Sequence, residues 1–281
     1  MKITVPGNLL LFGEYAITYP GGLGIAVATD AKVVVESSPA DQLSISGTFG
    51  NKTYRWTEGS PFPSPLVEYI VKTLNVFPSR HIHIDSSAFY YPDGRKKGYG
   101  SSAAVTIGLA CALLEPADKE ALLAQSLKLH RGFQGGKGSG YDIYASCNGG
   151  AGLFKGGEVP TWEPLQPGLF QTLHLLRGEH PCDTRQALQH LQQFEKQKPN
   201  DFTDFLNRSN AMVNDLSHSL ESFQKSIELN HWINARLPQE LPWREETIKP
   251  LGAGGEIGAT LSPLPDSEPL IISQDGIQWQ Q

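Results

Sequence analysis

The sequence predicts an α+β protein built from two domains. Its 281 residues are enough for two domains of average size, and 39% hydrophobic and 19% charged residues are ordinary for a globular chain. Strand-like and helical patterns are mixed in the first half, whereas the second half is mainly helical. Pro160, Pro164 and Pro167 mark the change between these patterns. We therefore expect domains at residues 1–160 and 161–281.

The first strands are apolar or β-branched runs between turn signals. Residues 6–15 predict a short apolar strand that ends in Gly-Glu, and residues 23–37 predict a longer strand. Residues 43–49 and 52–57 flank a Gly-Asn pair, which is typical of a hairpin turn. A β-hairpin is therefore expected after the two strands.

Helices with recognisable start signals follow the hairpin. A Ser-Pro pair predicts a helix over residues 64–77, with proline at its first helical position. Residues 80–85 alternate polar and apolar, as in a half-buried strand. An apolar helix is expected over residues 103–114, and an aspartate predicts the cap of another helix over residues 118–130.

The second half is expected to contain helices with a few strands. Apolar residues that recur every three or four positions predict the helices, and short β-rich runs predict the strands. The expected strands are residues 169–176, 258–262 and 270–273, and the expected helices are residues 184–197, 201–214 and 216–236.

Composition and charge exclude several classes of protein. Three cysteines without a C-x-x-C pair predict neither a disulfide framework nor a zinc cluster, and they indicate a reducing, cytoplasmic location. The net charge is −6, with +2 for residues 1–155 and −8 for the rest. A general nucleic-acid-binding protein is instead expected to be basic. The longest uncharged apolar run has 12 residues, fewer than the roughly 20 that cross a bilayer. We therefore expect no nucleic-acid or membrane partner, and the oligomeric state is left open.

A Gly-Tyr-Gly-Ser-Ser segment leads directly into the apolar helix. Its glycines allow backbone amides to approach an anion, and the helix N-terminus adds positive partial charge. Its serines either cap the helix or complete a magnesium shell, and the lysines before it can neutralise phosphate. A plain glycine turn with a serine cap is the alternative. The candidate cofactor-binding residues are Lys96, Lys97, Gly98, Gly100, Ser101, Ser102 and Ala103, and Ser102 is also the candidate metal ligand.

A second glycine-rich segment, Gly-Gly-Lys-Gly-Ser-Gly-Tyr-Asp, enters a short helix. Its aspartate falls in the first helical turn, where the dipole favours the ionised form and keeps it available as a proton acceptor. The alternative is an acidic residue that only stabilises the helix. The candidate catalytic residues are Asp142 and Lys137, and the candidate substrate-binding residues are Ser139 and Gly140.

Two further segments lie near the ends of the chain. The cluster Leu-Gly-Ala-Gly-Gly-Glu at 251–256 permits close approach of a ligand or another strand, or forms a tight turn. In Pro-Gly-Asn-Leu-Leu-Leu-Phe-Gly-Glu at 6–14, the final glutamate either points into a site or caps a turn. The candidate substrate-binding residues here are Asn8, Glu14, Gly252, Gly254 and Gly255.

Three segments, in the same order, resemble the signatures of the GHMP small-molecule kinases. They are PGNLLLFGE for P-G-K-x-x-L-x-G-E, GYGSSAA for G-L-G-S-S-A-A, and LGAGGE for G-A-G-G-G. The resemblance runs from residue 6 to about residue 261. The segment HRGFQGGKGSGYDIYASCNGG is similar to the corresponding segment of phosphomevalonate kinases. The resemblance implies a two-domain α+β fold, with an N-terminal domain of ribosomal-protein-S5 type and a ferredoxin-like C-terminal domain.

The resemblance also implies an ATP- and Mg²⁺-dependent kinase that acts on a small metabolite, with phosphomevalonate converted to its diphosphate in isoprenoid biosynthesis. Asp142 then matches the catalytic aspartate, and Ser101 and Ser102 match the magnesium and phosphate serines. Mevalonate kinase or another GHMP sugar or metabolite kinase remains an alternative. A non-catalytic nucleotide- or metabolite-binding homologue is the alternative of another class.

Two departures from the family pattern bear on activity. Asn8 stands where the family has a lysine that assists phosphoryl transfer, and an amide supplies no positive charge. Arg131 stands where mevalonate kinases have a helical glutamate, which favours a phosphomevalonate-type metal shell. From the sequence alone, Asn8→Lys should raise turnover unless another cation has taken over.

Overall fold

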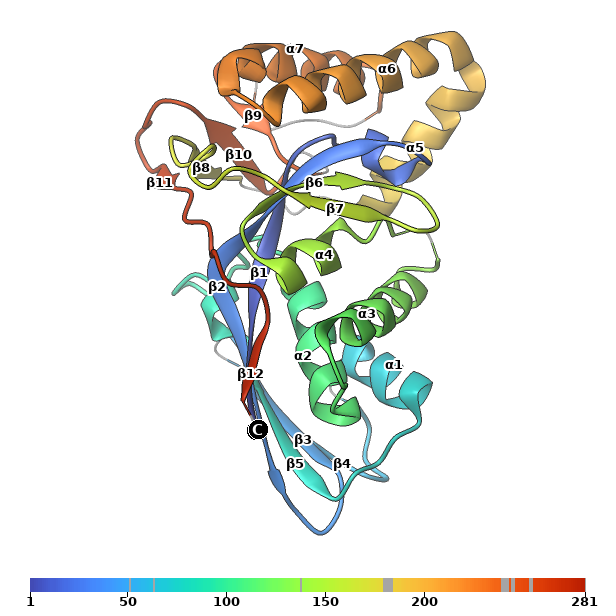
Figure 1. Cartoon of the computed structure of the whole chain (residues 1–281), viewed down its shortest axis with the longest axis vertical. Helices are drawn as coiled ribbons and strands as arrows, with labels where there is room; N and C mark the ends of the chain where they lie inside the picture. The colour runs from blue at the N-terminus through green and yellow to red at the C-terminus, as the bar shows by residue number, and fades with distance from the viewer. Residues whose placement is uncertain are drawn as a thin grey trace. The chain divides into compact units, whose positions relative to one another are not determined.

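The computed structural model describes residues 1–50, 52–62, 64–136, 138–178, 184–238, 243, 246–252 and 255–280 (Figure 1). The chain forms two compact units: unit 1 is residues 1–8, 28–150 and 273–281, and unit 2 is residues 9–27 and 151–272. This division differs from the expected one at residue 160. The strands β1 (Lys2–Phe12) and β2 (Leu23–Pro39) are long enough to contribute to both units, so the chain passes repeatedly from one to the other.

The strands of the main sheet follow the order β12-β1-β2-β5-β3-β4. The expected hairpin is confirmed, because β3 and β4 pair antiparallel, while β3 also pairs parallel with β5. At the other edge β12 pairs with the start of β1. The remaining strands of this order are β3 (Ser44–Phe49), β4 (Lys52–Thr57), β5 (Arg80–Asp85) and β12 (Gln278–Gln280).

A buried helix forms the centre of unit 1. The side chains of α2 (Ser101–Leu114) from position 103 to 113 are all buried, as expected for a helix that is apolar on every side. A Cβ at Gly108 would lie 2.7 Å from Val35 Cγ2, so the missing side chain allows α2 to lie close against β2. The helix also packs against α1 (Pro65–Leu74), α3 (Lys119–Phe133) and α4 (Tyr141–Asn148).

Unit 2 contains an antiparallel sheet of order β11-β8-β10-β9 and three longer helices. Helices α6 and α7 lie side by side in Figure 1, and rings from α5, α6 and α7 pack together in an aromatic cluster. Residues 23–27 of β2 pair with β6, which pairs with β7. The strands named here are β6 (Ala151–Lys155), β7 (Thr161–Pro164), β8 (His174–Arg177), β9 (Lys249–Pro250), β10 (Ile257–Thr260) and β11 (Glu268–Pro269). The helices are α5 (Thr184–Gln197), α6 (Pro199–Leu216) and α7 (Phe223–Asn234). Short 3₁₀ helices lie at Ala16–Thr18, Ser87–Phe89 and Leu220–Ser222.

Two of the expected strands are wrong in extent. Residues 169–173 form successive turns after a Pro-Gly pair, so β8 begins only at His174. Residues 270–273 form no strand, and β11 lies just before them. Leu270 is nevertheless buried, and its N–H donates to the Leu173 carbonyl at 2.8 Å. Among the described residues, no helix has the length and apolar character needed to cross a bilayer.

Candidate active site

The glycine-serine segment forms the start of α2. Gly98 and Gly100 adopt φ values of 80° and 67°, a region that favours glycine. A Cβ at Gly100 would lie 2.3 Å from the side chain of Asn8, so space as well as conformation requires glycine there. The first amides of a helix, here from Ser101 onward, have no partner within the helix and carry positive partial charge. A helix start of this kind can bind an anion, and binding of ATP phosphates at this segment stays a prediction.

Two lysines precede this helix start. Lys96 is exposed, while Lys97 is half-buried, with Nζ 5.8 Å from the centre of the Tyr91 ring. The backbone N–H of Lys97 donates to the Phe89 carbonyl at 2.9 Å, which fixes the approach to the loop. The methyl group of Ala103 is fully buried in the core, so only the backbone of this candidate residue is left to bind a cofactor, and that role stays a prediction.

Asp142 lies in the first turn of α4, as expected. The helix begins after Gly140, whose φ is 94° and where a Cβ would lie 2.3 Å from Leu127 Cδ1. The Asp142 side chain is 15% exposed, and its Oδ1 accepts a hydrogen bond of 2.9 Å from the Ile143 N–H. The carboxylate is thus largely withdrawn from water and held at one oxygen by the backbone.

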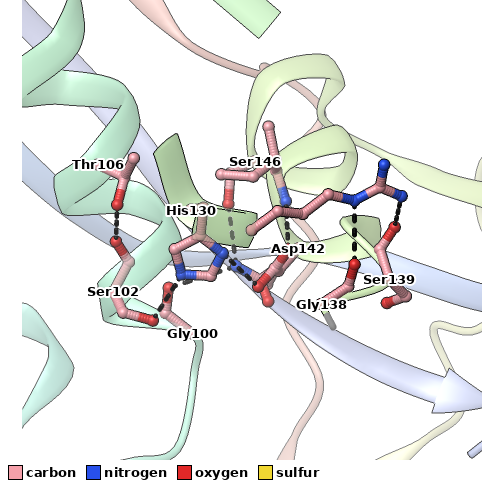
Figure 2. A network of polar contacts seen from close by, with 11 residues as sticks. Gly100, Ser102, Thr106, His130, Gly138, Ser139, Asp142 and Ser146 are labelled. Carbon is pink, nitrogen blue, oxygen red and sulfur yellow. Dashed lines mark hydrogen bonds and ion pairs between the residues drawn. The ribbon is translucent and has the colours of Figure 1, made fainter. Parts of the chain in front are cut away.

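Figure 2 shows that His130 lies between Ser102 and Asp142. Its Nδ1 is 3.1 Å from Asp142 Oδ2, its Nε2 is 3.3 Å from Ser102 Oγ, and its side chain is 2% exposed. Sequence reasoning missed this residue. A single histidine in a helix gives no periodic signal, and the two contacts join residues 12 and 28 positions apart, which only the packing of α2, α3 and α4 reveals.

The electrostatics of this pair favour its charged form. Desolvation by burial disfavours charge on both side chains, but the attraction between the two opposite charges outweighs it. The pKa of Asp142 is therefore lowered, and the pKa of His130 is raised. Asp142 stays ionised at neutral pH despite its burial, as a proton acceptor requires.

The loop before α4 is held by Arg131. Its Nε donates to the Gly138 carbonyl at 3.0 Å and its Nη2 to the Ser139 carbonyl at 2.6 Å. Arg131 therefore fixes the backbone next to Asp142. The substrate-binding role of Ser139 stays a prediction, and Lys137, the second catalytic candidate, lies outside the described residues.

Asn8 is buried and tied to both halves of this site. Its Nδ2 donates to Ser146 Oγ at 3.0 Å and to the Gly100 carbonyl at 3.3 Å, and its backbone N–H donates to the Tyr99 carbonyl at 2.9 Å. Ser146 lies one turn after Asp142 on α4. Asn8 therefore links the glycine-serine segment before α2 to α4, the helix that carries Asp142.

The other candidate residues belong to unit 2. Glu14 is buried, and its carboxylate forms an ion pair with the fully buried Lys249 of β9, which also donates to the Pro250 carbonyl at 3.2 Å. Desolvation raises the pKa of Glu14 and lowers that of Lys249, and the attraction between the two side chains opposes both shifts without cancelling them. Glu14 is thus engaged with Lys249, a residue that sequence reasoning did not single out.

The C-terminal glycines are described in part. Gly252 adopts a φ of 61°, and Gly254 lies outside the described residues. A Cβ at Gly178 would lie 2.0 Å from the Gly255 carbonyl oxygen, so Gly255 approaches another backbone closely. Gly255 therefore lies against the backbone of Gly178, and ligand binding by Gly252 and Gly255 stays a prediction.

The oxygen donors near α2 suit a Mg²⁺ ion that arrives with a nucleotide. Among the described residues, no three His, Cys, Asp or Glu side chains are placed to hold a metal together. Ser102 is exposed and offers one hydroxyl oxygen. Because Mg²⁺ usually keeps several waters and is held largely by substrate phosphates, one protein oxygen fits that arrangement.

Residues 65–150 match the family model for the GHMP kinases N-terminal domain. This segment of the chain is therefore similar to the GHMP kinases N-terminal domain. The matched range of this domain includes the helix start at 98–103 and the contacts of His130 with Asp142.

Two curated relatives are similar to about half of this chain. A mevalonate kinase from Archaeoglobus fulgidus is 30% identical over 158 residues, which cover 55% of this chain and 52% of the relative. A phosphomevalonate kinase from Streptomyces sp. (strain CL190) is 29% identical over 177 residues, which cover 52% of this chain and 46% of the relative. The chain spans about half the length of the curated relatives it matches.

A solved structure extends the similarity beyond the GHMP kinase domain. Streptococcus pneumoniae phosphomevalonate kinase, in complex with phosphomevalonate and AMPPNP, superposes with a TM-score of 0.72 over 94% of this chain and 93% of that chain. The sequence identity is 18%, so this likeness establishes the fold. The expected α+β GHMP kinase fold is confirmed.

Proposed function

We propose that the protein is an ATP-dependent kinase that uses Mg²⁺ and phosphorylates a small anionic metabolite, with phosphomevalonate as the favoured acceptor. One observation carries the proposal. Within the segment similar to the GHMP kinases N-terminal domain, the imidazole ring of His130 contacts both Ser102, at the start of α2, and the buried carboxylate of Asp142. Kinase chemistry needs these two elements, one to hold the phosphates and one to face the acceptor.

The residues of unit 1 suit the demands of phosphoryl transfer. Because the reaction passes through a loose transition state, catalysis depends on positioning and charge neutralisation. The amides from Gly100 to Ala103 would hold ATP phosphates. Mg²⁺ bound with the nucleotide would neutralise phosphate charge, with Ser102 as its protein ligand. Asp142 would orient or deprotonate the attacking group.

Basic side chains near the loop favour an anionic acceptor. Lys96 and Lys97 lie directly before the helix start, whereas the neighbouring Arg95 forms an ion pair of 2.8 Å with Asp93. The curated relatives are named mevalonate kinase and phosphomevalonate kinase, which supports a place in the mevalonate pathway. A phosphorylated acceptor makes fuller use of two cations than a neutral sugar does.

Two alternatives have an observation behind them. Mevalonate kinase activity is favoured by the Archaeoglobus relative, which is 30% identical. A non-catalytic nucleotide-binding homologue is favoured by Asn8, which brings no positive charge to the site.

The acceptor is tested by an ADP-release assay with Mg-ATP over phosphomevalonate, mevalonate, homoserine and galactose. We expect the highest kcat/KM with phosphomevalonate and poor turnover of galactose. A preference for galactose would overturn the acceptor assignment, and a preference for mevalonate would select the first alternative. Calorimetric binding of Mg-ATP without turnover of any acceptor would select the non-catalytic homologue.

The structure changes the expectation for Asn8→Lys. Asn8 is 2% exposed, and both its amide hydrogen bonds are made to site residues, so a longer side chain overpacks this position. We expect the free energy of unfolding to fall by about 1–3 kcal/mol and kcat not to rise. Urea unfolding and steady-state kinetics measure the two effects. A higher kcat at unchanged stability would show that position 8 still accepts a catalytic lysine.

A further inference from the structure

His130 is a buried polar residue that the chemistry above leaves without a role. It lies on α3, and both of its ring nitrogens face side chains of the candidate site that come from other helices. A histidine that only fills a core needs partners for its nitrogens, but those partners need not be the two groups that face nucleotide and acceptor. The position of the ring between Ser102 and Asp142 therefore indicates a more specific role (Figure 2).

We propose that His130 is the positioning residue for Asp142: its Nδ1–H holds the carboxylate in the orientation needed to face the acceptor. The inference rests on the proposed kinase function. It adds a residue that touches neither substrate nor nucleotide in this scheme and acts through the aspartate.

The geometry shows how the carboxylate is held. Oδ1 accepts from the Ile143 N–H at 2.9 Å, and Oδ2 lies 3.1 Å from His130 Nδ1. With the Ile143 N–H at one oxygen and the His130 ring nitrogen at the other, the carboxylate cannot rotate without losing one of these two contacts in a buried site. Removing His130 frees Oδ2 and leaves the group held at one oxygen only.

The two ring contacts are unequal. The Nδ1 contact with Asp142 Oδ2 is 3.1 Å long and joins a carboxylate to a ring whose side chain is 2% exposed. The Nε2 contact with Ser102 is longer, at 3.3 Å, and Ser102 is exposed. We therefore expect the Nδ1 donor to matter most, which a pair of amide variants can separate.

His130→Asn and His130→Gln differ in which ring nitrogen they replace. The amide of Asn can take the place of Nδ1–H, whereas the longer Gln places its amide near Nε2. His130→Gln should lower kcat by roughly 10²-fold with the KM for ATP nearly unchanged, because the carboxylate is misplaced and nucleotide binding is not. His130→Asn should retain most of the turnover that His130→Gln loses.

A matched control is Leu129→Val, at the adjacent buried position of α3. It should lower the melting temperature without changing kcat, because it loosens packing and leaves Asp142 held. If His130→Gln lowers the melting temperature like the control and leaves kcat unchanged, His130 is only structural and the proposal is wrong. Equal loss of kcat in His130→Asn and His130→Gln would also contradict a role for the Nδ1 donor.

A second measurement is independent of turnover. In protein labelled with ¹⁵N-histidine, NMR should show a proton on Nδ1 of His130, assigned by its absence from His130→Asn and displaced in Asp142→Asn. An Nδ1 without a proton would overturn the inference even if the enzyme is active. If no acceptor is turned over, the proposed function fails, and this signal alone decides whether His130 holds Asp142.

Discussion

Asp142→Asn is expected to lower kcat by roughly 10²–10⁴-fold, the usual contribution of a general acid or base. Asparagine keeps the size of the side chain and an oxygen that can accept from the Ile143 N–H, but it removes the charge. The affinity for Mg-ATP should remain nearly unchanged, because the phosphates are assigned to the amides at the start of α2.

The same substitution should cost little stability. Without the carboxylate, burial favours the neutral form of His130, so no unpaired charge remains in the site. If Asp142 only stabilises the first turn of α4, the loss is limited to about 0.3–1 kcal/mol of stability and turnover is retained. Measuring kcat beside a thermal melt separates these outcomes.

Asp118→Asn is the matched control for Asp142→Asn. Asp118 also stands at a helix start, where its side chain accepts from the Ala121 N–H at 2.8 Å, and asparagine can keep this cap. We expect its kcat to equal that of the wild type. A similar loss of kcat in both variants would show that general damage to unit 1, and not the charge of Asp142, accounts for the effect.

The second large effect is on stability and concerns the Glu14–Lys249 pair. Lys249→Met should lower the free energy of unfolding by about 3–5 kcal/mol, because it leaves a buried carboxylate without its cation. The Glu14→Gln variant should be destabilised for the corresponding reason. The double variant should regain much of the loss, since replacing both charges leaves neither ion unpaired. Urea unfolding of the four proteins measures these differences.

An exposed ion pair on α1 provides the control. Lys72 Nζ lies 2.6 Å from Glu68 Oε1, and the two side chains are 66% and 41% exposed, respectively. Lys72→Met should change the free energy of unfolding by less than about 1 kcal/mol, because water screens the pair. If Lys249→Met is as mild as Lys72→Met, or if the double variant is no more stable than Lys249→Met, the buried pair has a different energetic role.

Local signals predicted most elements of unit 1. The hairpin at 43–57, the central apolar helix and the cap at Asp118 all depend on neighbouring residues, and the structure confirms them. The strand expected at 169–176 is wrong in extent, because the turns after Pro-Gly override the strand-forming character of the following apolar residues. Residues 270–273 form no strand, and of the two apolar residues at the start of this run Leu270 is buried whereas Ile271 is exposed.

The candidate site was only partly predictable for the same physical reason. Gly100 and Asp142 belong to short motifs whose chemistry is visible in sequence. His130 and Lys249 acquire their significance from partners 12 and 235 positions away, and no local pattern encodes those contacts. Asn8 was recognised only as a departure from a family pattern, and its hydrogen bonds to Gly100 and Ser146 required the folded chain.

The passage of β1 and β2 through both units limits how the chain can be divided. A fragment that stopped at residue 160 would lose β12, the antiparallel partner of residues 2–4, and would keep residues 9–27 without most of unit 2. Cutting at one linker therefore produces two incomplete pieces and no autonomous module. Insertions and fusions are better placed in exposed loops within one unit, such as the one around Gly94, than at the nominal border between halves.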